Sequence, residues 1–230
     1  MTVQMSYESC YLTVDSLEAL REYYNFSKPH HIFENDLHIV NNPTDINHRK
    51  KMDASVLSLI AANAPAGRML DIGTHFGRSA ARMAVNSPNS IVYTVNVHPN
   101  QAQDAGLLVT DILPEEEIGK FYRQHNIPNI RQIYANTKYW DIPPEISDLS
   151  VVYVDGCHDT EFVISDTKLV YDRVRSGGFI LWHDFSPIYR KNFNWIDAAM
   201  NGVEQLIAEG VVKGFVLNVR NSWIGIWQKQ

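Results

Sequence analysis

The chain has 230 residues, of which 45% are hydrophobic, and it carries a formal net charge of -6 at pH 7. This length and composition are typical of one globular domain with a full core. The negative net charge and the lack of a long basic cluster argue against a nucleic-acid-binding protein. Because no segment resembles a membrane span or a secretory signal, the sequence predicts a cytoplasmic protein that binds no membrane.

Short runs rich in Val, Ile and Tyr alternate with longer amphipathic stretches after residue 50. The predicted strands, in chain order, are residues 68–72, 91–97, 130–134, 151–154 and 179–182. The predicted helices are residues 52–62, 78–86, 115–125, 161–174 and 196–209. The closing segments GFVLNVRN and SWIGIWQK predict an antiparallel hairpin at the end of the sheet. Together these elements predict a Rossmann-like, doubly wound α/β fold with a mostly parallel, seven-stranded sheet.

The first 50 residues precede this pattern and are polar, rich in histidine and weakly periodic. We predict that residues 1–50 form a separate N-terminal segment. Its role would be either a lid or a contact between subunits of a homo-oligomer. Residues 51–230 would then form the main domain.

The segment MLDIGTHFGRSA places glycine residues directly after a predicted buried strand. In open α/β sheets, ligands bind beyond the carboxyl ends of the strands, and glycine lets the backbone approach them closely. Gly73 and Gly77 suit that task. Their spacing, G-x-x-x-G, differs from the dinucleotide pattern G-x-G-x-x-G and argues against a nicotinamide cofactor. The alternative is a tight turn without a ligand.

Side chains that could bind a cation follow two later strands. Asp155 follows the fourth predicted strand, and His183 and Asp184 follow the fifth. Because adjacent parallel strands end at the same rim of a sheet, we expect these side chains to converge and to hold Mg2+ or Mn2+. The alternative is that Asp155 caps a helix, His183 packs in the core and Asp184 forms a turn.

Several motifs occur along the chain in one order: DIGTHFGRS, IVYTVNV, IYANTKYWD, VDGCHDTEFVISD and GGFILWHDF. In this order they resemble the class I S-adenosylmethionine-dependent methyltransferases. Within that class, they are similar to the small-molecule O-methyltransferase branch of macrocin and cephalosporin-tailoring enzymes. The resemblance covers about residues 50 to 230. It implies a methyltransferase domain over residues 51–230, S-adenosylmethionine as cofactor and a small hydroxylated molecule as acceptor.

The resemblance also implies which residues bind the cofactor. Asp71, Gly73 and Gly77 would form the loop under its methionine part. Asn96 stands where the family usually has an acid for the ribose hydroxyls, and Asn136 stands near the expected adenine site. Each amide loses a charge-assisted hydrogen bond, and the alternatives are a strand-end cap for Asn96 and a loop turn for Asn136. The full predicted set is Asp71, Gly73, Thr74, His75, Gly77, Ser79, Asn96, Asn136 and Thr137.

Methyl transfer to oxygen requires an acceptor hydroxyl that is held opposite the sulfonium and loses its proton. A cation lowers the pKa of such a hydroxyl, and a histidine with a reference pKa of about 6.5 can take the proton near neutral pH. We therefore predict an O-methyltransferase in which His158 is the general base. One alternative is a non-catalytic, methyltransferase-like binding protein. The other is a nicotinamide-dependent oxidoreductase, and the glycine spacing disfavours this second alternative.

Overall fold

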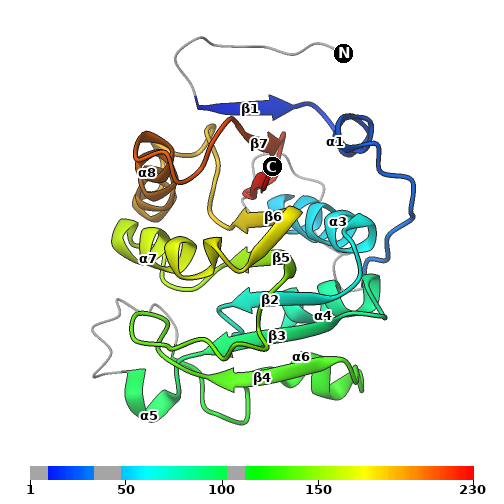
Figure 1. Ribbon diagram of the computed structural model, residues 1–230, viewed down its shortest axis with the longest axis vertical. Coiled ribbons are helices and arrows are strands. Elements are labelled where there is room, and N and C mark those ends of the chain that lie inside the picture. Colours follow the sequence, from blue (N-terminus) through cyan, green and yellow to red (C-terminus); the bar gives the residue numbers. More distant parts are fainter. Residues whose placement is uncertain (1–9, 34–47, 103–111) are drawn as a thin grey trace.

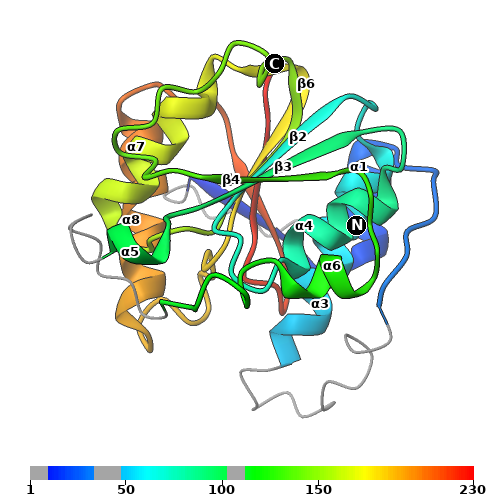
Figure 2. The same cartoon turned by 90° about the horizontal axis from the view of Figure 1, so that it is seen from below.

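A computed structural model describes residues 10–33, 48–102 and 112–230 of the chain. A central sheet crosses the molecule, with helices on both of its faces (Figures 1 and 2). Within these residues, no helix is long and apolar enough to cross a membrane. The architecture confirms the predicted mostly parallel α/β fold.

The sheet has eight strands in the order β1-β7-β8-β6-β5-β2-β3-β4. All neighbouring pairs are parallel except those that β8 makes with β6 and β7. The predicted terminal hairpin is therefore confirmed. The strands are β1 (Tyr11–Val14), β2 (Arg68–Ile72), β3 (Ile91–Asn96), β4 (Ile130–Tyr134), β5 (Leu149–Val154), β6 (Val174–Trp182), β7 (Val216–Val219) and β8 (Gly225–Gln228).

The helices cover the two faces of the sheet and bury separate apolar clusters (Figure 2). One face carries α1 (Leu17–Tyr24), α3 (His48–Asn63), α4 (Arg78–Asn86) and α6 (Lys120–Gln124). The other carries α5 (Pro99–Ala102), α7 (Thr160–Tyr171) and α8 (Asn194–Ala208). In α8 the buried residues Ile196, Met200 and Val203 recur at helical spacing, whereas every residue of β5 is buried. A strand covered by helices on both faces has this continuous burial.

The prediction of seven strands is corrected by β1, which pairs in parallel with β7 and adds an eighth strand. The sequence interpretation placed this segment outside the sheet. An edge strand pairs on one side only and can be short, so it has no long apolar run to reveal it. The backbone nitrogens of Val216 and Arg220 donate to the carbonyls of Cys10 and Val14, over 3.1 and 2.8 Å, at the two ends of the strand.

The predicted helix over residues 115–125 is wrong in its first half. The helix begins only at Lys120, and Gly119 before it has a φ of 71° in the left-handed region. A residue in that region interrupts a right-handed helix. The other predicted bounds shift by a few residues. The largest of these shifts is in β6, which already begins at Val174, so that the preceding helix ends at Tyr171.

Part of the N-terminal segment packs against the main domain. Leu20 of α1 is fully buried. The backbone nitrogens of Lys28 and His31 donate to the side-chain oxygens of Asn63 in α3 and Asn86 in α4, over 2.8 and 2.6 Å. Residues 1–9 and 34–47, on which the lid or oligomer prediction also falls, lie outside the described residues. That role stays a prediction.

Candidate functional site

The carboxyl ends of the central parallel strands bring the predicted site residues to one edge of the sheet. In register, Ile72 of β2 lies beside Val95 of β3 and Val154 of β5, and Val154 lies beside Trp182 of β6. Backbone bonds continue this pairing beyond the strands, since Asp155 N donates to Ile72 O over 2.8 Å. The glycine loop and the residues that follow β5 and β6 are therefore neighbours.

The glycine loop after β2 approaches other backbone very closely. A Cβ on Gly73 would lie 1.9 Å from the carbonyl oxygen of Asp155, and one on Gly77 would lie 2.5 Å from the ring of Tyr122. Both glycines have φ in the left-handed region, at 102° and 81°. Internal packing alone therefore requires glycine at both positions. Their role in cofactor binding stays a prediction. Gly73 also brings the glycine loop against Asp155, one of the predicted cation ligands.

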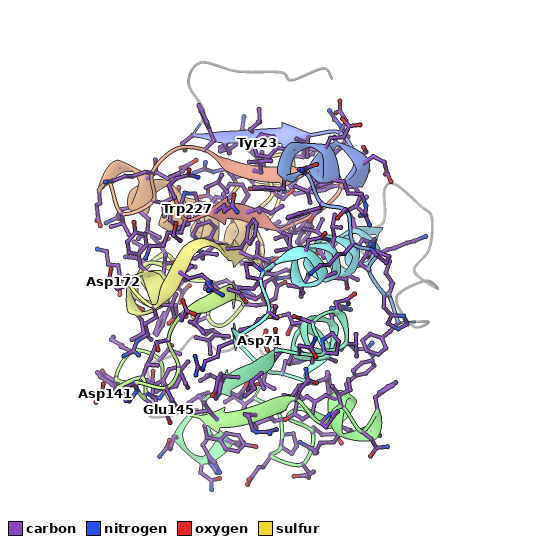
Figure 3. The ribbon with its side chains drawn as sticks, turned by 45° about the vertical axis from the view of Figure 1, so that its right-hand side comes forward. Tyr23, Asp71, Asp141, Glu145, Asp172 and Trp227 are labelled. Atoms are coloured by element: carbon purple, nitrogen blue, oxygen red, sulfur yellow. The ribbon has the colours of Figure 1, made fainter. Side chains whose placement is uncertain are left out.

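Asp71 lies inside the molecule, at the end of β2 (Figure 3). Its Oδ2 accepts a 2.6 Å hydrogen bond from the Thr94 hydroxyl, and the buried Ser79 lies nearby. The Thr74 and Thr94 hydroxyls are 2.8 Å apart, and Gln132 donates to Thr74 over 3.0 Å. Since a hydroxyl has one proton to donate, Thr94 donates to Asp71 and Thr74 donates to Thr94. Thr94 of β3 thus links Asp71 to Thr74 at the start of the glycine loop.

Burial raises the pKa of Asp71 to about 7, although the hydrogen bond from Thr94 and the nearby Ser79 oppose the rise. The folded protein therefore holds this proton more tightly than the unfolded chain, whose Asp has an ordinary pKa near 3.8. Asp71 should lower the free energy of unfolding as pH rises from about 4 to about 7, by up to a few kcal/mol. Urea unfolding at pH 5 and pH 8 should show a smaller pH difference for Asp71→Asn than for the wild type. Equal pH differences would contradict the assignment.

Asn96, at the end of β3, fixes the glycine loop. Its Oδ1 accepts a 3.2 Å bond from the backbone nitrogen of His75, and its Nδ2 donates to Val97 O over 2.9 Å. His75 has a φ of 47°, a strained conformation for a residue with a side chain, and its side chain is exposed. The amide thus holds an unfavourable turn at the edge where the resemblance expects the ribose.

Asn136 and Thr137 follow β4 and lie next to the end of β3, because Ala135 N donates to Asn96 O over 3.0 Å. Asn136 Oδ1 accepts from Lys138 N over 3.1 Å, which is the loop turn expected of Asn. Burial raises the pKa of Asp166 in α7 to about 6, and the nearby Thr137 opposes this rise. The structure therefore brings the predicted cofactor residues to three neighbouring strand ends.

Asp155, His158, His183 and Asp184 form a compact cluster, and one ligand atom from each lies within 4.8 Å of the others. His183 Nδ1 lies 2.9 Å from Asp155 Oδ1 and 3.4 Å from Asp184 Oδ2. His158 Nδ1 lies 3.2 Å from Asp184 Oδ2, and its Nε2 lies 3.5 Å from Asp155 Oδ1. The expected convergence of Asp155, His183 and Asp184 is observed, and the cluster also contains His158.

The cluster is strongly coupled electrostatically. Burial alone would lower the pKa of His183, but the carboxylates of Asp155 and Asp184 outweigh it and raise this pKa well above 6.5. Burial would likewise raise the pKa of both carboxyls, and the two histidines hold it below its ordinary value. The same balance raises the pKa of His158. Without a bound cation, the imidazoles therefore neutralise the carboxylates.

The cluster has a further neighbour that the sequence interpretation missed. Asp53 of α3 is buried, and its Oδ2 lies 3.6 Å from His183 Nε2. Its other oxygen accepts from Ser222 Oγ over 2.8 Å and from Trp223 N over 2.7 Å. The one signal in the sequence was an acid within a run of otherwise apolar and small residues, MDASVLSLIAA. Such an acid on the buried face of a helix needs a polar partner.

Comparison with known proteins identifies the family of the chain. A family model described as a methyltransferase domain matches residues 70–185, just over half of the chain. A search of curated proteins found no significant match. The structure is similar to the S-adenosylhomocysteine-bound methyltransferase PaMTH1 of Podospora anserina, at 11% identity over 93% of this chain and 94% of that one, with a TM-score of 0.58.

A second solved structure has the same fold. The O-methyltransferase TomG of Streptomyces achromogenes, in complex with S-adenosylmethionine, is 13% identical over 90% of this chain and 95% of that one, with a TM-score of 0.55. At such identities the likeness concerns the fold, whereas the family model matches the sequence that runs from β2 to the end of β6 and carries both groups of site residues. The chain therefore belongs to the methyltransferase-domain family, and it has the fold of the class I S-adenosylmethionine-dependent methyltransferases.

Proposed function

We propose that the protein transfers a methyl group from S-adenosylmethionine to a hydroxyl oxygen of a small molecule, with a divalent cation at the cluster and His158 as general base. The observation that carries the proposal is the cluster itself: Asp155, His158, His183 and Asp184 meet at the strand ends, directly against the glycine loop. A site for the methyl donor and a site for the acceptor hydroxyl would thus lie side by side.

The residues at the ends of β2, β3 and β4 fit S-adenosylmethionine. The loop after β2 is followed by α4, and Asn96 and Asn136 offer amide groups that can donate to and accept from hydroxyls and ring nitrogens. PaMTH1 and TomG, which share the fold, were solved with S-adenosylhomocysteine and S-adenosylmethionine bound. When bound, the cofactor supplies a methyl group on a sulfonium, which an oxygen nucleophile can attack in line.

The cluster also fits a divalent cation. Asp184 is buried, and its Oδ1 has no hydrogen-bond partner among the residues that the structure describes. An ionised oxygen in that position is costly to bury without a compensating charge or donor. Carboxylate and imidazole ligands together suit Mn2+, and carboxylates alone suit Mg2+. A bound cation supplies positive charge that favours the ionised form of the acceptor hydroxyl.

His158 would remove the proton of that hydroxyl. Its side chain is more exposed than those of His183 and Asp184, at 30% against 16% and 3%, so an acceptor can reach it. Both of its ring nitrogens now contact carboxylates of the cluster. Asp155 and Asp184 would hold the cation with their oxygens, and one ring nitrogen of His158 would then be available to the acceptor.

The first test measures methyl transfer after removal of metal. Purified protein is treated with chelator and incubated with S-adenosylmethionine and a panel of phenols, sugars and other hydroxylated molecules. We expect formation of S-adenosylhomocysteine to fall at least about tenfold after chelation and to return with Mg2+ or Mn2+, since a cation at the reacting oxygen supplies several kcal/mol of charge stabilisation. Full activity in chelator would contradict the role of the cation.

Calorimetric titration separates the alternatives. The proposed function requires binding of S-adenosylmethionine, whereas a nicotinamide-dependent oxidoreductase would bind NAD instead. A non-catalytic binding protein would bind the cofactor or the acceptor and release no S-adenosylhomocysteine with any acceptor, whether or not metal is present.

A further inference from the structure

We propose that Asp53 is a positioning residue, which holds the ring of His183 so that Nδ1 faces Asp155 and Asp184. The proposed function assigns no role to Asp53. Only the expected effect of Asp53 on metal affinity rests on the proposed function. Asp53 comes from α3, far from the cluster in sequence, and it meets His183 from the side opposite the two other carboxylates. Its Oδ2 lies 3.6 Å from Nε2, while Nδ1 lies 2.9 Å from Asp155 Oδ1.

The carboxylate of Asp53 is itself held from the other side. Oδ1 accepts bonds from the Ser222 hydroxyl and the Trp223 nitrogen, in the turn between β7 and β8. The same turn anchors the backbone next to the cluster, because Phe185 N donates to Trp223 O over 2.9 Å. One turn therefore fixes both Asp53 and the chain that carries His183 and Asp184. The other carboxylate oxygen, Oδ2, faces His183.

The chemical consequence concerns the proton of the imidazole. A neutral imidazole carries its proton on one nitrogen and offers a lone pair on the other. An ionised carboxylate can only accept, so Asp53 favours a proton on Nε2 and a lone pair on Nδ1. In a cation-loaded site that lone pair would face the cation between Asp155 and Asp184, whereas without a cation the same two carboxylates favour a proton on Nδ1. Carboxylates that orient a metal-ligating histidine in this way typically affect metal affinity by about 10- to 100-fold.

Asp53→Asn is the informative change because it preserves shape, removes the negative charge that faces Nε2 over 3.6 Å and places an NH2 donor there. Its Oδ1 can keep both bonds from the β7–β8 turn, and its amide NH2 then faces Nε2. A donor at that place favours a lone pair on Nε2 and a proton on Nδ1. Asp197→Asn is the control: it removes the same charge from another helix, where the carboxylate pairs with Arg190 over 2.7 Å.

Two measurements on the full chain test the inference without any turnover. Mn2+ binding, followed by the electron paramagnetic resonance of free Mn2+, should weaken about 10- to 100-fold in Asp53→Asn and stay within about twofold of wild type in Asp197→Asn. The thermal midpoint of Asp53→Asn should remain close to that of the wild type. The ring 15N resonance of His183 Nε2, the nitrogen that faces residue 53, should move in metal-free Asp53→Asn and stay unchanged in metal-free Asp197→Asn.

The two measurements distinguish a failure of the proposed function from a failure of the inference about Asp53. If the wild type binds no Mn2+, the cation in the proposed function is wrong, and the His183 Nε2 resonance alone decides the role of Asp53. An unchanged His183 Nε2 resonance in Asp53→Asn overturns the inference, whatever the metal result. Wild-type Mn2+ affinity in Asp53→Asn, beside a lost affinity in Asp155→Asn, overturns it for the metal-loaded protein.

Discussion

Asp184→Asn should lose at least about 100-fold in Mn2+ affinity and lose methyl transfer with it, because the carboxylate is buried at the centre of the cluster. Its Oδ2 faces both histidines, and its Oδ1 has no other partner among the described residues. Substitution of neighbours of a metal ligand already costs about 10- to 100-fold, so loss of a ligand should cost more. Metal affinity and turnover should be measured on the same preparation.

The backbone conformation at position 184 is compatible with this substitution. Asp184 has a φ of 54°, in the left-handed region, and Asn is among the few side chains that tolerate it. A matched control is Asp172→Asn, an exposed carboxylate just after α7 on the outside of the molecule (Figure 3). If Asp184→Asn kept wild-type metal affinity and activity, Asp184 would be a structural residue and the cluster would not be a metal site.

His158→Ala should reduce the turnover number by about a hundred to ten thousand fold and leave Mn2+ and S-adenosylmethionine bound. A general base acts in the chemical step, so its loss lowers the rate constant for turnover more than the affinity of either ligand. The pattern differs from that of Asp184→Asn, in which affinity and turnover fall together. Single-turnover rates and Mn2+ affinity, measured side by side, distinguish the two roles.

His125→Ala is the control for loss of an imidazole. His125 follows α6, where it stacks near Phe121 and its Nδ1 lies 2.8 Å from Phe121 O, away from the strand ends that carry the cluster. If His158→Ala lost metal affinity and turnover to the same extent, His158 would be a fourth ligand and not the base. The short distances from His158 to both carboxylates make this the sharpest alternative to test.

The sequence alone was sufficient for the fold class and for the edge of the sheet at which the candidate site residues lie. Alternating apolar strands and amphipathic helices are local patterns, and a parallel arrangement follows from their order. The convergence of Asp155, His183 and Asp184 could also be predicted, because each follows a strand and parallel strands end together. These inferences need only the position of a residue within its own element.

The tertiary structure alone decided which distant residues touch. It placed β1 in the sheet, gave Gly73 the carbonyl of Asp155 as its close neighbour, and put Asp53 behind His183. It also brought His158 into contact with the same carboxylates that were expected to bind the cation. None of these contacts leaves a periodic signal, because each depends on the packing of elements that lie far apart in sequence or on the path of a loop. The pattern of residues predicts where side chains gather, whereas only the packed fold determines which atoms face one another.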